Sequence, residues 1–413
     1  MKDTKNTLIN LTSFGVTSFL GLYLYFLLVK NGNEEVLGIF NIQYIFIILF
    51  SQLSTFGFHY SVLREATIKN CTENDNFNNL FSAILLIFVN SIILCSLIFV
   101  FRNIWKTIVE FNPVNILIPI ILFSINKAFY WFLNGKEKYL KMAFISPVRF
   151  FIYLIVFLNL SNSYDNYQNL YLCFLYSEIV VLFLSLIFIQ SETNFNFSYS
   201  GYKSYLKKHI SYGRKSFLTS FLSDLNLKID IIVISVILGN QFVGYYTFSS
   251  AIGEGFIALI AATRTISTPQ FENFIYSRDD FQKFLIRIRK ISYSLFIPIG
   301  ISIISISYFF GNQFKFLGNL TSNGFFSLVV IISGFTMLSY LFSFEHVLLQ
   351  INHPAVHTKC LLILFFSNLI FNIFLVNSYG INGAAFATIF SYFFYFYQIN
   401  KNLKKITGNS FIT

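Results

Sequence analysis

The 413-residue chain is 55% hydrophobic, 20% aromatic and only 11% charged, so it has too few polar residues to cover soluble domains of this size. Its formal net charge of +11 would suit a nucleic-acid-binding protein, but the basic residues lie in short loops between apolar runs and form no nucleic-acid-binding motif. The composition therefore predicts an all-α polytopic membrane protein with no soluble domain and no nucleic-acid partner.

A bilayer-spanning helix needs about 20 mainly apolar residues, and such runs follow one another along the whole chain. Twelve spans are predicted, at residues 8–29, 36–58, 80–101, 114–134, 143–162, 169–190, 216–238, 243–265, 288–310, 324–348, 358–377 and 380–399. An even number of spans places both termini on one side of the membrane.

The distribution of Lys and Arg predicts which side that is. With both termini inside, the internal segments hold 22 of the 29 basic residues, the external loops hold 4 and the spans hold 3. Because cytoplasmic loops are enriched in Lys and Arg, we expect both termini to be cytoplasmic.

The polar interval Ser191–Lys215 separates six spans from six. We therefore predict an N-terminal six-helix lobe at 1–190, a cytoplasmic basic linker at 191–215 and a C-terminal six-helix lobe at 216–413. Within the linker, lysines alternate with Tyr and Leu over residues 202–208. This pattern fits an amphipathic helix on the cytoplasmic leaflet or a solvated basic loop.

Two short segments indicate that the lobes are related. Residues 230–255 join two apolar runs through a very short uncharged connector, which predicts a membrane helical hairpin. At an offset of 206 residues, Val36–Phe40 falls on Phe242–Tyr246, and each segment follows one apolar run and opens another. The chain is therefore expected to consist of two pseudo-symmetric halves.

Three segments together resemble the polysaccharide transporters, typified by Wzx-type O-antigen flippases, of the multidrug/oligosaccharidyl-lipid/polysaccharide (MOP) exporter superfamily. They are the hairpin that begins at Asp230 and includes Gly244, the segment Tyr379–Thr388 with its YGxxGAAxAT-like pattern, and the region from Gly38 through Thr55-Phe56-Gly57 to Arg64-Glu65-Ala66.

The resemblance implies a multi-pass protein of the bacterial cytoplasmic (inner) membrane, with two six-helix lobes around a central cavity that opens alternately to each side. It implies a transporter rather than an enzyme, which exports a polyprenyl-pyrophosphate-linked oligosaccharide, an O-antigen or capsule repeat unit, in polysaccharide or lipopolysaccharide assembly. The implied partners are this lipid-linked oligosaccharide, membrane lipids and other polysaccharide-assembly membrane proteins. No cofactor is expected apart from a coupling H⁺ or Na⁺.

Small residues near the C-terminus predict close helix packing. Gly380, Ala384 and Thr388 form one stripe at a spacing of four residues, and Gly383 begins an adjacent stripe. Such stripes let a neighbouring helix backbone approach closely. We assign these residues to packing rather than to transport, and we expect Asp230 to face its own lobe as well, because it is rotated by about 200° from Lys228.

Five charged residues lie deep in the predicted spans. Lys127, Glu178, Lys228 and Glu254 fall near span centres, and Asp224 lies one turn before Lys228. A charge at a helix centre costs about 2.5 to 3.5 kcal/mol even on insertion scales, so each of these groups needs a partner or water.

Two interpretations of these charges remain open. They could pair inside the protein, Lys127 with Glu178 and Asp224 with Lys228. Alternatively, the cations could contact pyrophosphate or sugar hydroxyls in a wet cavity, with Glu254 or Asp224 as a proton or sodium site. Arg149 and Arg264 lie nearer the cytoplasmic ends, where they could snorkel or also line the cavity.

Other site types find little support. His353 and His357 are spaced like a metal pair, but Pro354 lies between them and no HExxH pattern follows, so no metal site is predicted. The four cysteines are scattered and are expected to be free thiols. Two rival functions are a cation-coupled multidrug exporter of the same superfamily and a polysaccharide polymerase, which the short external loops disfavour.

Overall fold

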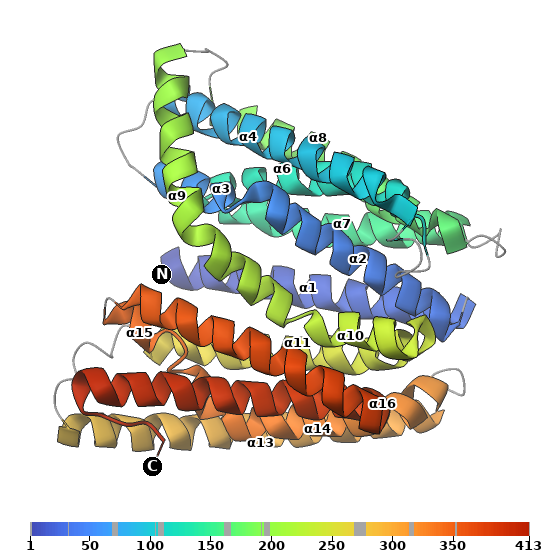
Figure 1. Cartoon of the computed structure of the whole chain (residues 1–413), viewed down its shortest axis with the longest axis vertical. Coiled ribbons are helices and arrows are strands. Elements are labelled where there is room, and N and C mark those ends of the chain that lie inside the picture. Colours follow the sequence, from blue (N-terminus) through green and yellow to red (C-terminus); the bar gives the residue numbers. More distant parts are fainter. Residues whose placement is uncertain are drawn as a thin grey trace. The chain divides into compact units, whose positions relative to one another are not determined.

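In the computed structural model, all regular secondary structure in the described part of the chain is helical (Figure 1). The described residues are 2–31, 33–67, 73–103, 105, 111–160, 167–190, 192–193, 199–267, 278–313, 318–351 and 353–412. Over these residues, nine helices are long and apolar enough to cross a membrane. This confirms the predicted all-α membrane architecture, and every predicted span falls on a described helix or on two consecutive helices.

The chain divides into two compact units, Met1–Phe221 and Leu222–Thr413. The predicted linker 191–215 thus lies in the first unit, and the division falls inside a helix. The first unit contains α1 (Lys2–Asn31), α2 (Glu34–Thr55), α3 (Phe58–Ala66), α4 (Glu73–Val100), η1 (Pro113–Ile116), α6 (Leu117–Gly135), α7 (Tyr139–Leu160), η2 (Tyr167–Leu170), α8 (Tyr171–Gln190) and most of α9 (Tyr199–Asn226).

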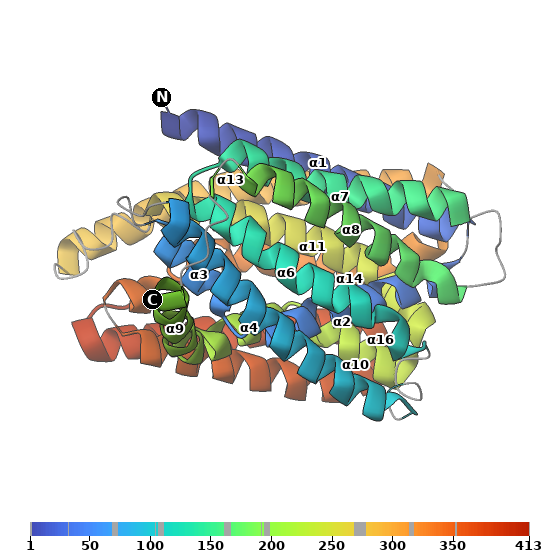
Figure 2. The ribbon, with the colours of Figure 1, turned by 90° about the horizontal axis from the view of Figure 1, so that it is seen from above.

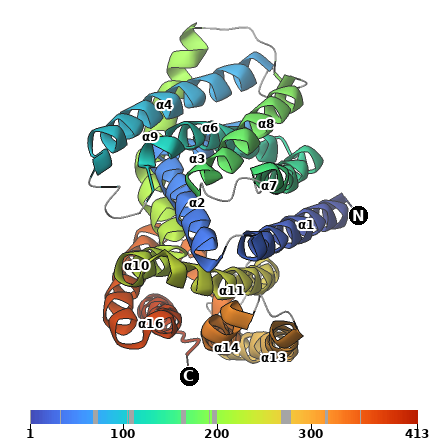
Figure 3. The same ribbon diagram turned by 90° about the vertical axis from the view of Figure 1, so that its right-hand side faces the viewer.

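Helix α6 is the centre of the first unit. It packs against α2, α3, α4 and α8, while α7 packs against α1 and α8. Figures 2 and 3 show α6 and α8 side by side. The central helix is apolar on most of its surface, so its burial removes a large hydrophobic area from solvent or lipid.

The predicted span 36–58 is interrupted in the structure. Helix α2 ends at Thr55, and both Phe56 (φ 45°) and Gly57 (φ 75°) adopt the left-handed conformation before α3 begins. Glycine adopts this conformation without the steric cost of a Cβ atom. The turn redirects the chain so that α3 packs on α4 and α6.

The second unit is built on α14. Its helices are α10 (Ile229–Leu238), α11 (Asn240–Ser267), α13 (Arg278–Gln313), α14 (Gly318–Phe342), α15 (Val347–Gln350) and α16 (Pro354–Thr407). Helix α14 packs against α11, α13 and α16, and α10 packs against α16. Figures 2 and 3 show α10 beside α16. The short uncharged turn between α10 and α11 is the predicted hairpin.

Helix α16 is two antiparallel helices rather than one. A straight helix of its 54 residues would be about 80 Å long, but Gly380 has non-helical backbone angles (φ 60°, ψ −142°). The Tyr395 hydroxyl lies 3.4 Å from His357 Nε2, 38 residues earlier, and the two halves run back along each other in Figure 1. The reversal matches the predicted boundary between the last two spans.

The predicted span 216–238 is wrong as a single helix. Helix α9 starts at Tyr199 inside the predicted linker and ends at Asn226, and α10 starts three residues later, at Ile229. Over residues 199–215 the structure therefore shows the helix and not the loop. Asp230 lies in the first turn of α10, where the helix dipole favours a carboxylate, and it accepts a hydrogen bond from the Ile231 N–H at 2.9 Å.

Candidate functional site

The first unit holds a buried ion pair between α7 and α8. Arg149 Nε lies 2.6 Å from Oε1 of Glu178, and Arg149 Nη2 donates to Oε2 at 3.2 Å. Asn126 on α6 completes the cluster, because its Nδ2 donates to Oε2 and to the backbone oxygen of Glu178, both at 2.9 Å. Glu178 is fully buried, so three helices are tied together around one carboxylate.

This cluster differs from the predicted pairing of Lys127 with Glu178. One residue corresponds to about 100° of helix rotation, so Asn126 faces α8 while Lys127 faces α2. The Lys127 ammonium donates to Gln52 Oε1. Snorkelling of Arg149 is also wrong, because its side chain is only 14% exposed and is held by Glu178.

Aromatic rings enclose the Arg149 cluster. The guanidinium lies 4.6 Å from the ring centroid of Phe123. Tyr153 is almost fully buried and contacts the ring of Phe174 edge to face. Rings on these sides leave little room for water, which strengthens the electrostatic attraction inside the cluster. The arrangement is that of a fixed structural element.

The second unit holds a more accessible ion pair. Lys228 lies in the break between α9 and α10, and its Nζ is 2.6 Å from Oε1 of Glu254 on α11. The side chains are 15% and 34% exposed, respectively. Ser250 Oγ adds a long hydrogen bond of 3.4 Å to the same carboxylate oxygen. The sequence predicted a partner for Lys228 at Asp224 in the same helix, and the structure adds Glu254 on another helix.

Glu254 also lines a small cavity in the second unit. Asp230, Tyr246, Thr388 and Asn226 share its wall. The Tyr246 hydroxyl donates to Asp230 Oδ2 at 2.6 Å, and both side chains are buried. The cavity volume is about 20 Å³, enough for a water or a small cation but far too small for a sugar.

One amide side chain that the charge pattern did not predict, Asn226, lines this cavity. The Asn226 side chain is buried, and neither its Nδ2 nor its Oδ1 has a hydrogen-bond partner among the described residues. Its backbone oxygen accepts from Asn368 Nδ2 at 3.3 Å, and Asn368 Oδ1 accepts from Asn372 at 2.8 Å. Asn residues within apolar runs were the available signal, as was Gln52 in the first unit.

The remaining predicted residues fall outside these clusters. Asp224 is half-buried near the end of α9, and Gly244 is buried in α11. Arg264 lies in α11, but its side chain is outside the described part of the structure. Ala384 is fully buried. A Cβ atom on Gly383 would overlap the backbone oxygen of Leu375, so this glycine permits the close return of α16.

Comparison with known proteins gives a family and a fold. The family model described as "Polysaccharide biosynthesis protein" matches residues 4–266. No curated protein sequence matches the chain. Among solved structures, the lipid II flippase MurJ in an inward closed conformation has a TM-score of 0.72 at 18% identity, and covers 96% of this chain and 87% of its own.

Two MATE transporters are similar as well. A multidrug resistance MATE family transporter of the MOP superfamily in an inward-facing conformation has a TM-score of 0.72 at 13% identity, covering 95% of this chain and 96% of its own. The eukaryotic MATE transporter AtDTX14 has a TM-score of 0.65 at 10% identity. The match covers 98% of this chain and 95% of AtDTX14. The fold is therefore that of MOP superfamily transporters.

Proposed function

The chain belongs to the polysaccharide biosynthesis protein family, and from this membership we propose that it carries a polyprenyl-pyrophosphate-linked oligosaccharide across the cytoplasmic membrane by alternating access. The cargo would be an O-antigen or capsule repeat unit. Both termini would be cytoplasmic, and the protein would act as a transporter rather than as an enzyme. The partners would be the lipid-linked oligosaccharide, membrane lipids and other polysaccharide-assembly membrane proteins.

The family match over residues 4–266 is the observation that carries this proposal. The fold does not separate the two transport functions, because the lipid II flippase and the multidrug resistance MATE family transporter have equal TM-scores of 0.72. A cation-coupled multidrug exporter is accordingly the alternative that an experiment must test.

The break between α9 and α10 supports a role for Lys228 in recognition of the polar part of the cargo. Non-helical backbone at membrane depth is tolerated where it lies inside the protein or lines a water-filled cavity, and discontinuous helices commonly form the binding sites of transporters. Lys228 lies in such a break, and its partner Glu254 is 34% exposed. It can exchange Glu254 for a phosphate or a sugar hydroxyl without leaving a charge in hydrocarbon.

A coupling cation, H⁺ or Na⁺, would bind beside this pair in the 20 Å³ cavity. A carboxylate from Asp230, an amide oxygen from Asn226 and a hydroxyl from Thr388 are hard oxygen ligands of the type that such cations prefer. The buried Asn226 amide has no described partner to lose on binding. Imposing a sodium or a pH gradient across proteoliposomes separates the two ions.

Reconstitution tests the proposed cargo. Purified protein in proteoliposomes should translocate a fluorescent polyprenyl-diphosphate oligosaccharide, measured by its accessibility to a membrane-impermeant quencher. Cationic dyes should not be transported under the same gradient. Dye transport without translocation of the lipid-linked sugar would instead establish the multidrug function.

A further inference from the structure

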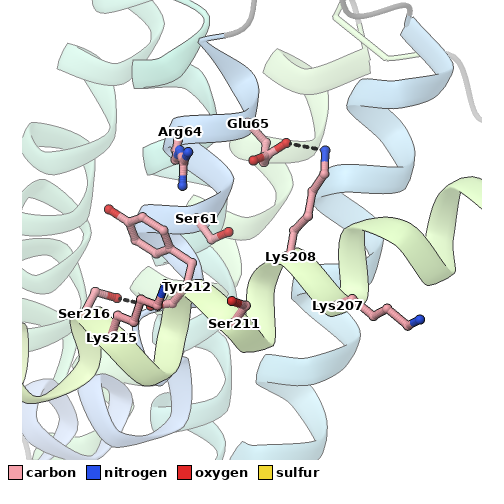
Figure 4. Close-up of a pocket in the computed structure, with 9 residues that line it drawn as sticks. All are labelled: Ser61, Arg64, Glu65, Lys207, Lys208, Ser211, Tyr212, Lys215 and Ser216. Carbon is pink, nitrogen blue, oxygen red and sulfur yellow. Dashed lines mark hydrogen bonds and ion pairs between the residues drawn. The ribbon is translucent and has the colours of Figure 1, made fainter.

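A basic cavity lies between α3 and α9 within the first unit (Figure 4). Its volume is about 630 Å³, in the range of small-molecule sites. Arg64 on α3 and Lys207, Lys208 and Lys215 on α9 line it, together with one carboxylate, Glu65. Four positive charges against one negative charge make this cavity a candidate anion site.

The spacing of the α9 residues brings them to one place. Lys207, Ser211 and Lys215 recur every four residues, which puts them on one face of the helix. Arg64 comes from the last turn of α3 and completes the opposite wall. Orientation in the membrane explains an excess of basic residues in this region, but it does not require them to converge on a common cavity.

Specific contacts hold α9 against the rest of the unit. The His209 ring donates from Nε2 to the Asn79 backbone oxygen at 3.0 Å, and its Nδ1 lies 2.9 Å from Ser61 Oγ. Gly213 allows close approach, because a Cβ atom there would lie 2.7 Å from the Phe56 oxygen. The cavity walls are therefore in place before a ligand binds, which reduces the ordering cost of binding.

The cations divide into one that holds the helix and three that face the cavity. Lys208 Nζ lies 2.7 Å from Glu65 Oε2, so this pair neutralises itself. Among the described residues, no carboxylate pairs with Arg64, Lys207 or Lys215, and all three are exposed. The Arg64 guanidinium lies 5.6 Å from the Tyr212 ring centroid, which restricts its orientation.

We propose that this cavity binds the phosphate-bearing headgroup of a membrane lipid. Arg64 would bind phosphate oxygens in a bidentate manner, and Lys207 and Lys215 would act as point charges. α3 directly follows the span formed by α2, so the cavity lies where a span ends and a headgroup can reach it while its chains stay in the bilayer. Two lipids carry this chemistry, an isoprenoid diphosphate and an anionic phospholipid. Assignment to the isoprenoid diphosphate rests on the proposed function, whereas recognition of a phosphate group does not.

Equilibrium binding to the purified full chain in detergent tests the proposal, with radiolabelled geranylgeranyl diphosphate as the probe. The variant Arg64→Gln/Lys207→Gln/Lys215→Gln should bind it at least about tenfold more weakly, since a hydrogen bond to a charged group is worth a factor of this order. A matched control, Lys401→Gln/Lys404→Gln/Lys405→Gln, removes the same number of exposed charges from the end of α16 and should bind like wild type.

Competition distinguishes the two sources of phosphate. Displacement of the probe by phosphatidylglycerol as effectively as by unlabelled diphosphate would assign the cavity to an anionic phospholipid, and displacement by the diphosphate alone would assign it to the cargo class. Wild-type affinity in the Arg64→Gln/Lys207→Gln/Lys215→Gln variant, or equal displacement by phosphatidylcholine, would overturn the proposal.

Two controls keep these results interpretable. A variant that retains the charges, Arg64→Lys/Lys207→Arg/Lys215→Arg, should keep most of the affinity, whereas a loss equal to that of the neutral variant would contradict phosphate binding by these residues. Translocation measured on the same preparations separates the two proposals. Phosphate binding without translocation would overturn only the proposed function, and translocation with probe binding unaffected by the neutral variant would overturn only the headgroup site.

Discussion

Two ion pairs, one in each unit, have the same 2.6 Å contact and very different surroundings. Glu178 in the first unit is fully buried, bonded to Arg149 and Asn126 and enclosed by aromatic rings. Glu254 in the second unit is 34% exposed and meets Lys228 at a helix break beside a cavity. Depth in a predicted span thus does not distinguish the two pairs. The exposure of the carboxylate does, since Glu178 is fully buried and Glu254 is not.

The largest expected effect comes from making the same substitution in both pairs. Glu178→Gln leaves the Arg149 charge buried without a counter-ion and should reduce the free energy of unfolding by about 3 to 5 kcal/mol. Glu254→Gln should reduce it by less than about 1 kcal/mol, because the Glu254 carboxylate is itself 34% exposed and its ion pair is screened by solvent. Thermal unfolding in detergent measures both. Equal destabilisation would remove the distinction between the pairs.

A substitution in α16 tests whether close helix packing, rather than the Lys228–Glu254 ion pair, stabilises the second unit. A Cβ atom on Gly383 overlaps the backbone oxygen of Leu375, which cannot move away cheaply. Gly383→Ala should therefore destabilise the protein by about 1 to 3 kcal/mol. Gly255→Ala is the matched control in the same unit, because a Cβ there meets nothing within 4 Å. Similar melting temperatures for the two variants would show that the close return of α16 is not important for stability.

A buried histidine on α9, His209, should make the stability of the first unit depend on pH. Burial lowers the pKa of His209 to about 4, while nearby Glu65 opposes the shift and Lys208 adds to it. The unfolded chain takes up a proton below about pH 6.5 and the folded chain only near pH 4, so stability is full above pH 6.5 and falls as the pH is lowered.

At pH 5 the expected loss is about 2 kcal/mol. Melting temperatures between pH 7 and pH 5 measure this loss, and His209→Gln, which has no titrating ring, should remove most of this dependence. A pH profile that the substitution does not change would show that His209 is not the titrating group.

The sequence predicted the membrane architecture well, because apolar runs of sufficient length in a membrane chain have little alternative to spanning it. It did not predict the break at Leu227 and Lys228, although charged and amide residues interrupt the apolar run there and α9 is much less apolar than α10. Nor could it predict the partners of the buried charges. A rotation of α6 by one residue decides whether Lys127 or Asn126 faces Glu178.

The basic cavity could also be predicted only in part from the sequence. The lysines of α9 were visible as a cluster in the sequence, but Arg64 lies more than 100 residues earlier and joins them only through the packing of α3 on the same unit. Local pattern predicts which helices are polar, whereas the chemistry of a site depends on which helix faces are brought together.

Translocation by two apolar double variants tests the central claim most directly. Lys228→Met/Glu254→Leu and Arg149→Met/Glu178→Leu each replace an ion pair with side chains of similar volume, and such replacements can preserve folding. In proteoliposomes, the first variant should lose translocation of a fluorescent polyprenyl-diphosphate oligosaccharide while remaining folded, and the second should retain it. Wild-type translocation by the Lys228→Met/Glu254→Leu variant would contradict the role assigned to the accessible pair.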